Sequence, residues 1–327
     1  MPTQKIEISL KTIIFTILFL LLLGLIWIVR DLIFSLFIAF IIVSALKPAV
    51  VFLEKKNLPR PLAAFLVYFS FLFILINLFL LVIPQLVGEL THLVKNFPTI
   101  IQSISPNLSP FFSLDSLAQY LPDLTNQLIN VIKGIFSNTI FVISTLFFGF
   151  YLLLEENLLE KTLTKFIEKG QAQKIIDIFF QAEKRMNAWF WGEIILMSVV
   201  GILTFIGLNL IGMKYILALA VLAGILEIVP NLGPVLSAVP AVLIGLSQSF
   251  LLGVSNIALY FIVQQLENNA IVPLVMKKAV GLNPITTLIA LIIGGKLAGV
   301  LGVLLAVPTT LFLETILIEV RKNIKNS

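Results

Sequence analysis

Long runs of uncharged, mostly apolar residues recur along the chain, separated by shorter charged stretches. Four of these runs cover residues 12–29, 61–88, 134–154 and 194–213. A helix needs about 20 apolar residues to cross a bilayer, and each run reaches or approaches that length. The runs are rich in Leu, Ile and Phe and lack the alternation of barrel strands. The pattern therefore predicts helices that span a membrane.

Charged and polar stretches between the runs divide the chain into parts. We interpret residues 1–327 as one membrane domain that contains, in order, an N-terminal three-helix unit (1–84), an extracytoplasmic amphipathic segment (85–133), a fourth helix (134–154), a cytoplasmic amphipathic segment (155–189) and a transport core (190–320). The second helix ends among Lys47, Lys55, Lys56 and Arg60. Loops rich in Lys and Arg remain in the cytoplasm, so the charge pattern predicts that both termini are cytoplasmic.

Two apolar stretches in the last third do not fit a simple crossing. Residues 215–229 and 235–246 are each too short, and the sequence PNLGP joins them. Residues 285–319 are too long for one span and are interrupted by GGKLAGVLG. Each stretch predicts a re-entrant helical hairpin, the first entering from outside and the second from the cytoplasm. The expected fold is an all-α integral membrane protein with about six full transmembrane helices, two re-entrant hairpins and amphipathic helices outside the bilayer.

A short internal repeat links the two predicted hairpins. VLSAVP at 235–240 aligns without a gap with VLLAVP at 303–308, and in both copies the motif follows a break that contains glycine. Paired broken segments in two copies are a sequence pointer to the binding site of a secondary transporter.

Composition supports the membrane assignment and limits the possible partners. The chain is 59% hydrophobic and 12% charged, with a mean hydropathy of +1.08, whereas soluble domains have about 25% charged residues. The net charge of +5 is accounted for by basic cytoplasmic loops. Basic clusters interleaved with aromatic residues are missing from the sequence, so we do not expect a nucleic-acid partner.

The sequence offers little for catalysis or for a cofactor. It contains no cysteine and one histidine, His92, so residues for thiolate or clustered histidine ligation of a metal are lacking. LIIGGKL resembles the end of a phosphate-binding loop, but Ala290 and Leu297 replace the required Gly and Ser/Thr. We therefore expect no enzyme activity, no catalytic residues, no metal, no cofactor and no ATP-driven pump.

Polar residues inside the apolar core are the best candidates for contact with a solute or an ion, because such residues are costly in hydrocarbon. Glu227 and Lys296 lie at the two hairpin breaks. They are interpreted as an ion pair that closes the two tips, as ligands of the solute, or as both. The expected binding residues are Glu227, Asn231, Gln264, Glu267, Asn268 and Lys296, where Gln264, Glu267 and Asn268 share one helix face.

Prolines and glycines are expected to shape the breaks and to allow close helix approach. They are Pro230, Gly233, Pro234, Pro240, Pro273, Pro284, Gly294, Gly295, Gly299, Gly302 and Pro308.

Three segments resemble the autoinducer-2 exporter family of bacterial membrane proteins. They are MNAWFWGEI, LEIVPNLGPVLSAVPAVLIGL and VQQLENNAIVPLVMKKAVGLNPITTLIALIIGGKLAGVLGVLLAVP, within about 185–318. The chain departs from the family pattern at Asn231 and Lys277. On this resemblance, some relatives export the quorum-sensing signal and others exchange sodium or lithium for protons. The resemblance therefore implies transport without deciding the cargo.

Together, the residues and the resemblance predict a secondary transporter or exporter of a small polar solute, with autoinducer-2 among the candidates. A sodium or lithium/proton antiporter ranks second, because neither Glu227 nor Glu267 has a paired carboxylate in the sequence. A third hypothesis is a non-transporting membrane scaffold. The expected partners are the lipid bilayer, the solute or a monovalent cation or proton, and further copies of the chain. The expected location is the bacterial inner membrane, as a multi-pass protein.

The topology can be tested with single cysteines, because the chain contains none. In Pro110→Cys the thiol should react with a membrane-impermeant maleimide added to intact cells, since residues 85–133 are predicted to lie outside. Labelling only after the membrane is opened would invert the topology.

Overall fold

Every regular element in the described part of the computed structural model is a helix. The structure describes residues 10–78, 80, 84, 88, 138–155, 158–230, 232–276 and 283–325. Six of the described helices are long and apolar enough to cross a membrane, and a bent pair at 139–166 would make a seventh. The prediction of an all-α membrane protein is confirmed. The predicted amphipathic segment at 85–133 lies outside the described residues, apart from Gly88.

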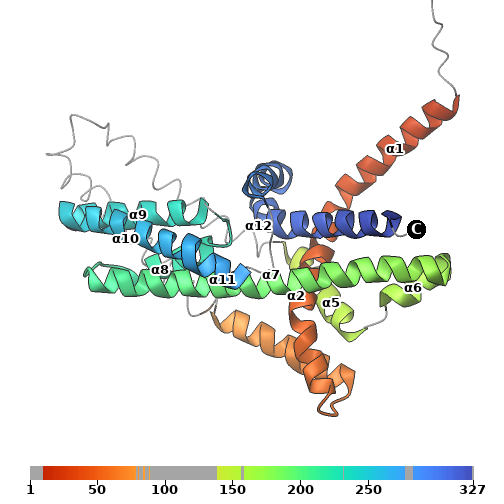
Figure 1. The fold of residues 1–327 in the computed structure, drawn as a ribbon, viewed down its shortest axis with the longest axis horizontal. Coiled ribbons are helices and arrows are strands. Elements are labelled where there is room, and N and C mark those ends of the chain that lie inside the picture. Colours follow the sequence, from red (N-terminus) through yellow and green to blue (C-terminus); the bar gives the residue numbers. More distant parts are fainter. Residues whose placement is uncertain are drawn as a thin grey trace, which may run out of the picture.

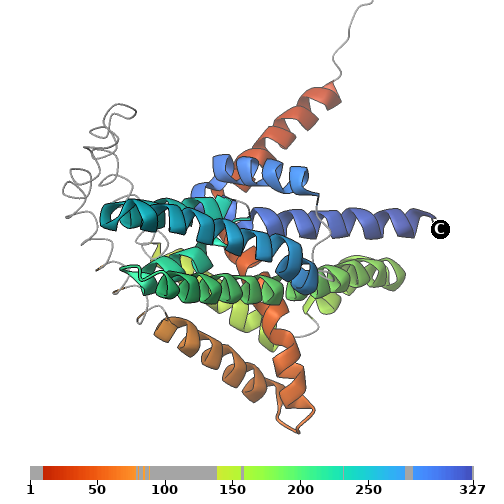
Figure 2. The same cartoon turned by 60° about the vertical axis from the view of Figure 1, so that its left-hand side comes forward.

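The N-terminal helices form a small bundle of their own. The bundle consists of α2 (Arg30–Glu54), the helix Arg60–Leu78 and α5 (Thr139–Leu154), and α1 (Leu10–Ile28) precedes it. α1 projects away from the other helices, whereas α2 packs against α5 (Figures 1 and 2). Tyr68 is buried in this bundle and donates a hydrogen bond to the carbonyl of Leu146 over 2.8 Å. A partner for this hydroxyl allows the tyrosine to lie inside an apolar core.

The longest uninterrupted element is α7 (Lys169–Leu210), which follows the short α6 (Leu158–Phe166). Its 42 residues give a length of about 63 Å, roughly twice the thickness of a hydrocarbon core. The predicted boundary between residues 189 and 190 therefore falls inside one continuous helix. Lys47 on α2 pairs with Glu183 over 2.9 Å, and Arg185 pairs with Glu314 over 3.0 Å. These pairs fix the N-terminal half of α7 to its neighbours.

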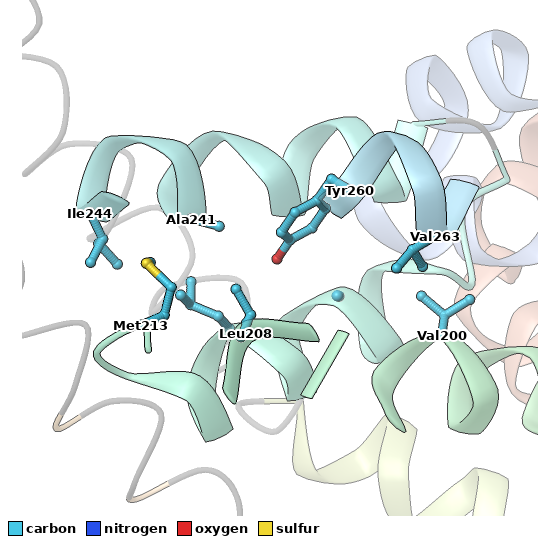
Figure 3. Packing of buried hydrophobic residues seen from close by; sticks show 9 residues of the cluster. Val200, Leu208, Met213, Ala241, Ile244, Tyr260 and Val263 are labelled. Carbon is cyan, nitrogen blue, oxygen red and sulfur yellow. The ribbon is translucent and has the colours of Figure 1, made fainter. Parts of the chain in front are cut away.

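Of the three shorter helices that follow, the first and the third pack against α7, and the middle one packs against those two (Figure 1). α8 (Ile216–Leu226) and α9 (Leu232–Gln248) form a helical hairpin, and α10 (Phe250–Leu266) packs against α9. α7 and α8 approach closely because Gly201 and Gly224 face each other, so a Cβ on Gly224 would lie 2.7 Å from the Met197 carbonyl oxygen. Such small residues are typical of tight helix contacts in membranes. Figure 3 shows the apolar core enclosed by these four helices.

The break between α8 and α9 falls at the predicted PNLGP sequence. A Cβ on Gly233 would collide with the carbonyl oxygen of Leu226, so only glycine allows the chain to turn this tightly. The amide of Gly233 donates to the Val229 carbonyl over 2.9 Å. The turn therefore satisfies part of its own backbone, as the predicted position of this break within the membrane would require.

After α10 the chain passes through a π-helical turn (Glu267–Ile271) into α11 (Val272–Met276), and then α12 (Pro284–Lys325) begins. α12 reverses at Ala298 and Gly299, where Gly299 has φ +58° and ψ −135°. Its two limbs are visible as separate helices in Figure 2. The second limb packs on α2, α7 and α11 through Leu305 and Leu311. The predicted break at GGKLAGVLG thus also produces a hairpin, although the faces from which both hairpins enter remain predictions.

The two hairpins share a close approach at nearly matching positions. The repeat places residues 235 and 303 in register, an offset of 68 positions, which also relates Leu226 to Gly294. A Cβ on Gly302 would collide with the carbonyl of Gly294, just as one on Gly233 would collide with that of Leu226, although Gly302 lies one position beyond the residue that the offset relates to Gly233. Gly299 acts differently, since the space around it is open and its positive φ is the constraint.

Gly302→Ala should lower the melting temperature of the detergent-solubilised protein by several degrees. The new methyl group would meet backbone, which cannot move aside as a side chain can, and overpacking typically costs about 1–3 kcal/mol. Gly24→Ala in α1 is the matched control, because a Cβ there meets open space. Equal melting temperatures for Gly302→Ala and wild type would contradict the close approach of the two limbs.

Candidate functional site

Three buried carboxyl groups lie where α7, α8 and α10 come together. Glu193 is on α7, Glu227 directly follows α8, and Glu267 begins the π-helical turn after α10. Their exposed fractions are 5%, 3% and 5%, and all the other charged residues whose side chains are described are more exposed. We refer to these three residues as the carboxyl cluster.

The groups of the carboxyl cluster are close enough to interact with one another. The carboxyl groups of Glu227 and Glu267 lie within hydrogen-bonding reach, and Glu193 interacts electrostatically with both. Gln264 donates a hydrogen bond from Nε2 to Oε2 of Glu267 over 3.1 Å. Oε2 of Glu227 has no hydrogen-bond partner among the described residues. The cluster is therefore acidic and incompletely satisfied by the protein itself.

Local backbone structure places each carboxyl group. Glu227 still donates its amide to the Ala223 carbonyl over 3.2 Å, so it keeps the direction of α8 just before the chain turns at Pro230. Glu267 continues a buried face that also carries Tyr260 and Val263. It does so at the first residue of a π-helical turn, a feature that is frequent at functional sites.

The structure brings together only some of the residues predicted from the sequence. Glu227 and Glu267 meet, with Gln264 bonded to Glu267, whereas Asn268 and Lys296 are exposed. Lys296 has no ion pair with Glu227 in the described structure, so the interpretation of a pair closing the two tips gains no support. Asn231 lies outside the described residues. The meeting of the two tips near mid-membrane remains a prediction.

Glu193 was not among the binding residues predicted from the sequence. This residue lies directly before the apolar run 194–213, at a position that reads as the membrane boundary. The signal that could have identified it is its spacing. Leu196 and Val200 follow it by three and seven positions and are buried with it, which marks one helix face.

The described part of the chain contains no preformed set of metal ligands. There, no three acidic or histidine side chains are arranged to hold a metal ion together. The carboxyl cluster thus offers closely spaced oxygens for a proton or a weakly held cation.

Comparisons with known proteins point to transport. The sequence profile of a family described as AI-2E family transporter matches residues 15–322. The chain is 30% identical to YueF of Bacillus subtilis (strain 168) over 319 residues, covering 91% of this chain and 86% of YueF. It is 25% identical to YrrI of the same organism over 304 residues, covering 88% and 85%. It is 23% identical to PerM of Escherichia coli (strain K12) over 315 residues, covering 90% and 89%. YueF and YrrI are provisionally named transport proteins, and PerM a permease.

A double-mutant cycle tests whether Glu227 interacts with Lys296, as the sequence predicted. The effects of Glu227→Gln and Lys296→Met on the free energy of unfolding should add within about 0.5 kcal/mol, because the two side chains share no contact. Lys47→Met and Glu183→Gln form the control cycle, since these residues do form an ion pair. Restoration of stability in the Glu227/Lys296 double variant alone would show that the two tips are joined.

Proposed function

Because this chain belongs to the AI-2E transporter family, we propose that it is a secondary transporter whose driving proton or monovalent cation binds between Glu227 and Glu267, beside Glu193. The membrane transport function follows from the family. The assignment of the coupling site to these residues is our proposal, and it rests on the burial of three interacting carboxyl groups inside the helix bundle.

In its ionised form, the carboxyl cluster would carry buried negative charge that needs a balancing positive charge. Two carboxylates in contact repel each other strongly, so both cannot be ionised unless a proton or a cation lies between them. Charge within a membrane segment normally faces a partner or a watery cavity. Among the residues whose side chains are described, no Lys or Arg is buried beside the cluster. A mobile proton or cation is the remaining source of positive charge.

This arrangement favours monovalent cation/proton antiport as the leading function. The same carboxyl oxygens can hold either a proton or a sodium or lithium ion, so the two compete for one site. The sequence alone ranked antiport second because Glu227 and Glu267 looked unpaired. In the structure the two carboxyl groups are in contact, so they form the carboxylate pair that was not evident from the sequence.

A second candidate is proton-driven export of a small organic molecule such as autoinducer-2. A pocket of about 480 Å³ lies between α9 and α10, within the size range of small-molecule sites. Gln264 lines it and bonds to Glu267, which connects the pocket to the carboxyl cluster. The rest of the lining is apolar apart from Tyr260, so it offers a highly hydroxylated solute few hydrogen bonds. We therefore rank this function second.

The location and assembly of the protein follow from the same reasoning. We place it in the bacterial inner membrane with both termini in the cytoplasm, on the basis of its basic loops. The apolar side chains exposed all along α1 would face lipid or a second copy of the chain, and a homo-oligomer remains part of the proposal.

The test is proton movement in proteoliposomes that contain the pure protein and a trapped pH-sensitive dye. Under an imposed pH gradient, adding sodium or lithium should release protons through the wild type. Glu227→Gln and Glu267→Gln should each slow this release at least about tenfold, because each removes a shared ligand. Glu160→Gln, an exposed carboxylate on α6, is the matched control and should behave as wild type.

The same preparation distinguishes the rival functions. Proton movement coupled to efflux of a furanone signal molecule, with no response to sodium or lithium, would identify the exporter. Wild-type proton release by Glu227→Gln and Glu267→Gln would remove the cluster from the coupling mechanism. Movement of neither cation nor furanone would favour a scaffold.

A further inference from the structure

Four buried side-chain atoms in the described structure lack a hydrogen-bond partner, and all four lie in the same region. They are Oε2 of Glu227, Oγ1 of Thr204, Oη of Tyr260 and Oδ1 of Asn256. Thr204 is on α7, whereas Tyr260 and Asn256 are on α10. Unsatisfied groups are thus concentrated among α7, α8 and α10, where the carboxyl cluster also lies.

Helical spacing places these groups in two parallel rows that begin at the carboxyl cluster. Thr204 follows Glu193 by eleven positions on α7, which is about three helical turns and returns to the same face. On α10, Tyr260 and Asn256 precede Glu267 by seven and eleven positions and share its face. The row on α10 therefore extends about 16 Å from the cluster, roughly half the thickness of a hydrocarbon core.

The far end of the rows lies at the turn that follows α7. Nδ2 of Asn256 donates to the sulfur of Met213 and to the carbonyl of Leu252, both over 3.0 Å, whereas Oδ1 stays unpaired. Between this end and the cluster, Figure 3 shows the Tyr260 hydroxyl pointing from α10 toward the part of α7 that carries Leu208. Leu208 and Thr204 are four positions apart on one face of α7.

A purely structural role does not explain these groups. Burying a hydroxyl or an amide without a partner costs about 1–3 kcal/mol, so an apolar side chain of the same shape would make the core more stable. Thr204 on α7 and Tyr260 and Asn256, which are one turn apart on α10, instead offer buried atoms to which water molecules could hydrogen-bond.

We propose that Thr204, Tyr260 and Asn256 line a narrow hydrated path that conducts protons between the carboxyl cluster and the membrane face near Met213. Each hydroxyl accepts a hydrogen bond from one water and donates to the next, so a proton entering at one end releases another at the opposite end. The conducting role rests on the proposed function, whereas the hydration of the path does not.

Hydration can be measured with single cysteines in this cysteine-free chain. Thr204→Cys and Asn256→Cys should react with Ag⁺ added to membrane vesicles, since silver ions reach thiols through water, and should then resist maleimide labelling after denaturation. Ala64→Cys is the matched control, because Ala64 is fully buried in the separate N-terminal core. If Thr204→Cys and Asn256→Cys were as unreactive toward Ag⁺ as Ala64→Cys, the path would be dry and the proposal wrong.

Conduction is measured with variants that remove a hydroxyl and keep the shape. Tyr260→Phe and Thr204→Val should slow proton uptake at least about tenfold while the melting temperature stays equal or rises. Wild-type proton rates in both variants would overturn the conducting role. Reactive cysteines combined with wild-type proton release by Glu227→Gln would instead mean that the path exists and that the proposed coupling site is wrong.

Discussion

The burial of three neighbouring carboxyl groups, Glu193, Glu227 and Glu267, is the constraint on which the architecture of the C-terminal half depends. In a soluble protein, water would screen these charges, but inside an apolar bundle the field of each reaches the others. The surrounding helices must therefore hold the groups together against their repulsion. They do so through the close contact of Gly201 with Gly224 and through the single amide of Gln264. Under the proposed function, the stability of this region would depend on what occupies the cluster, which is the property that a coupling site requires.

Interrupted helices follow from the same constraint. Glu227 keeps the direction of α8, and a straight helix continuing past it would prevent the return of the chain into α9. The turn at PNLGP ends the helix where its last carboxyl group meets the others, and Gly233 makes the return compact. α12 uses the same construction, with Gly302 against the Gly294 carbonyl. The two hairpins have similar turns, and they carry VLSAVP and VLLAVP in corresponding limbs. Both features are consistent with duplication of one hairpin.

Several features could be predicted from the sequence because they depend on local chemistry. The apolar runs indicated the helix class, and both breaks fell at the predicted Pro/Gly stretches. Glu227 and Glu267 stood out because charge is rare in apolar segments. Other features depend on packing between distant residues. Glu193 looked like a boundary residue until α8 and α10 placed two carboxyl groups beside it. Lys296 looked like a partner for Glu227, but its exposure depends on how α12 lies. The continuity of α7 was missed because a change from amphipathic to apolar residues alters the environment of a helix without breaking it.

The length of α7 has a mechanical consequence. Lys169 and Leu210 are the ends of one unbroken rod, and Glu193 lies just past its middle. A rod of this kind cannot tilt at one end only. A rotation of a few degrees that displaces the end joined to α6 also displaces Glu193 relative to the carboxyl groups on its neighbours. The ion pairs of Glu183 and Arg185 lie between Glu193 and the end of α7 that is joined to α6. Force applied to the amphipathic half of α7 would thus shift Glu193 along with the helix and change its spacing from Glu227 and Glu267.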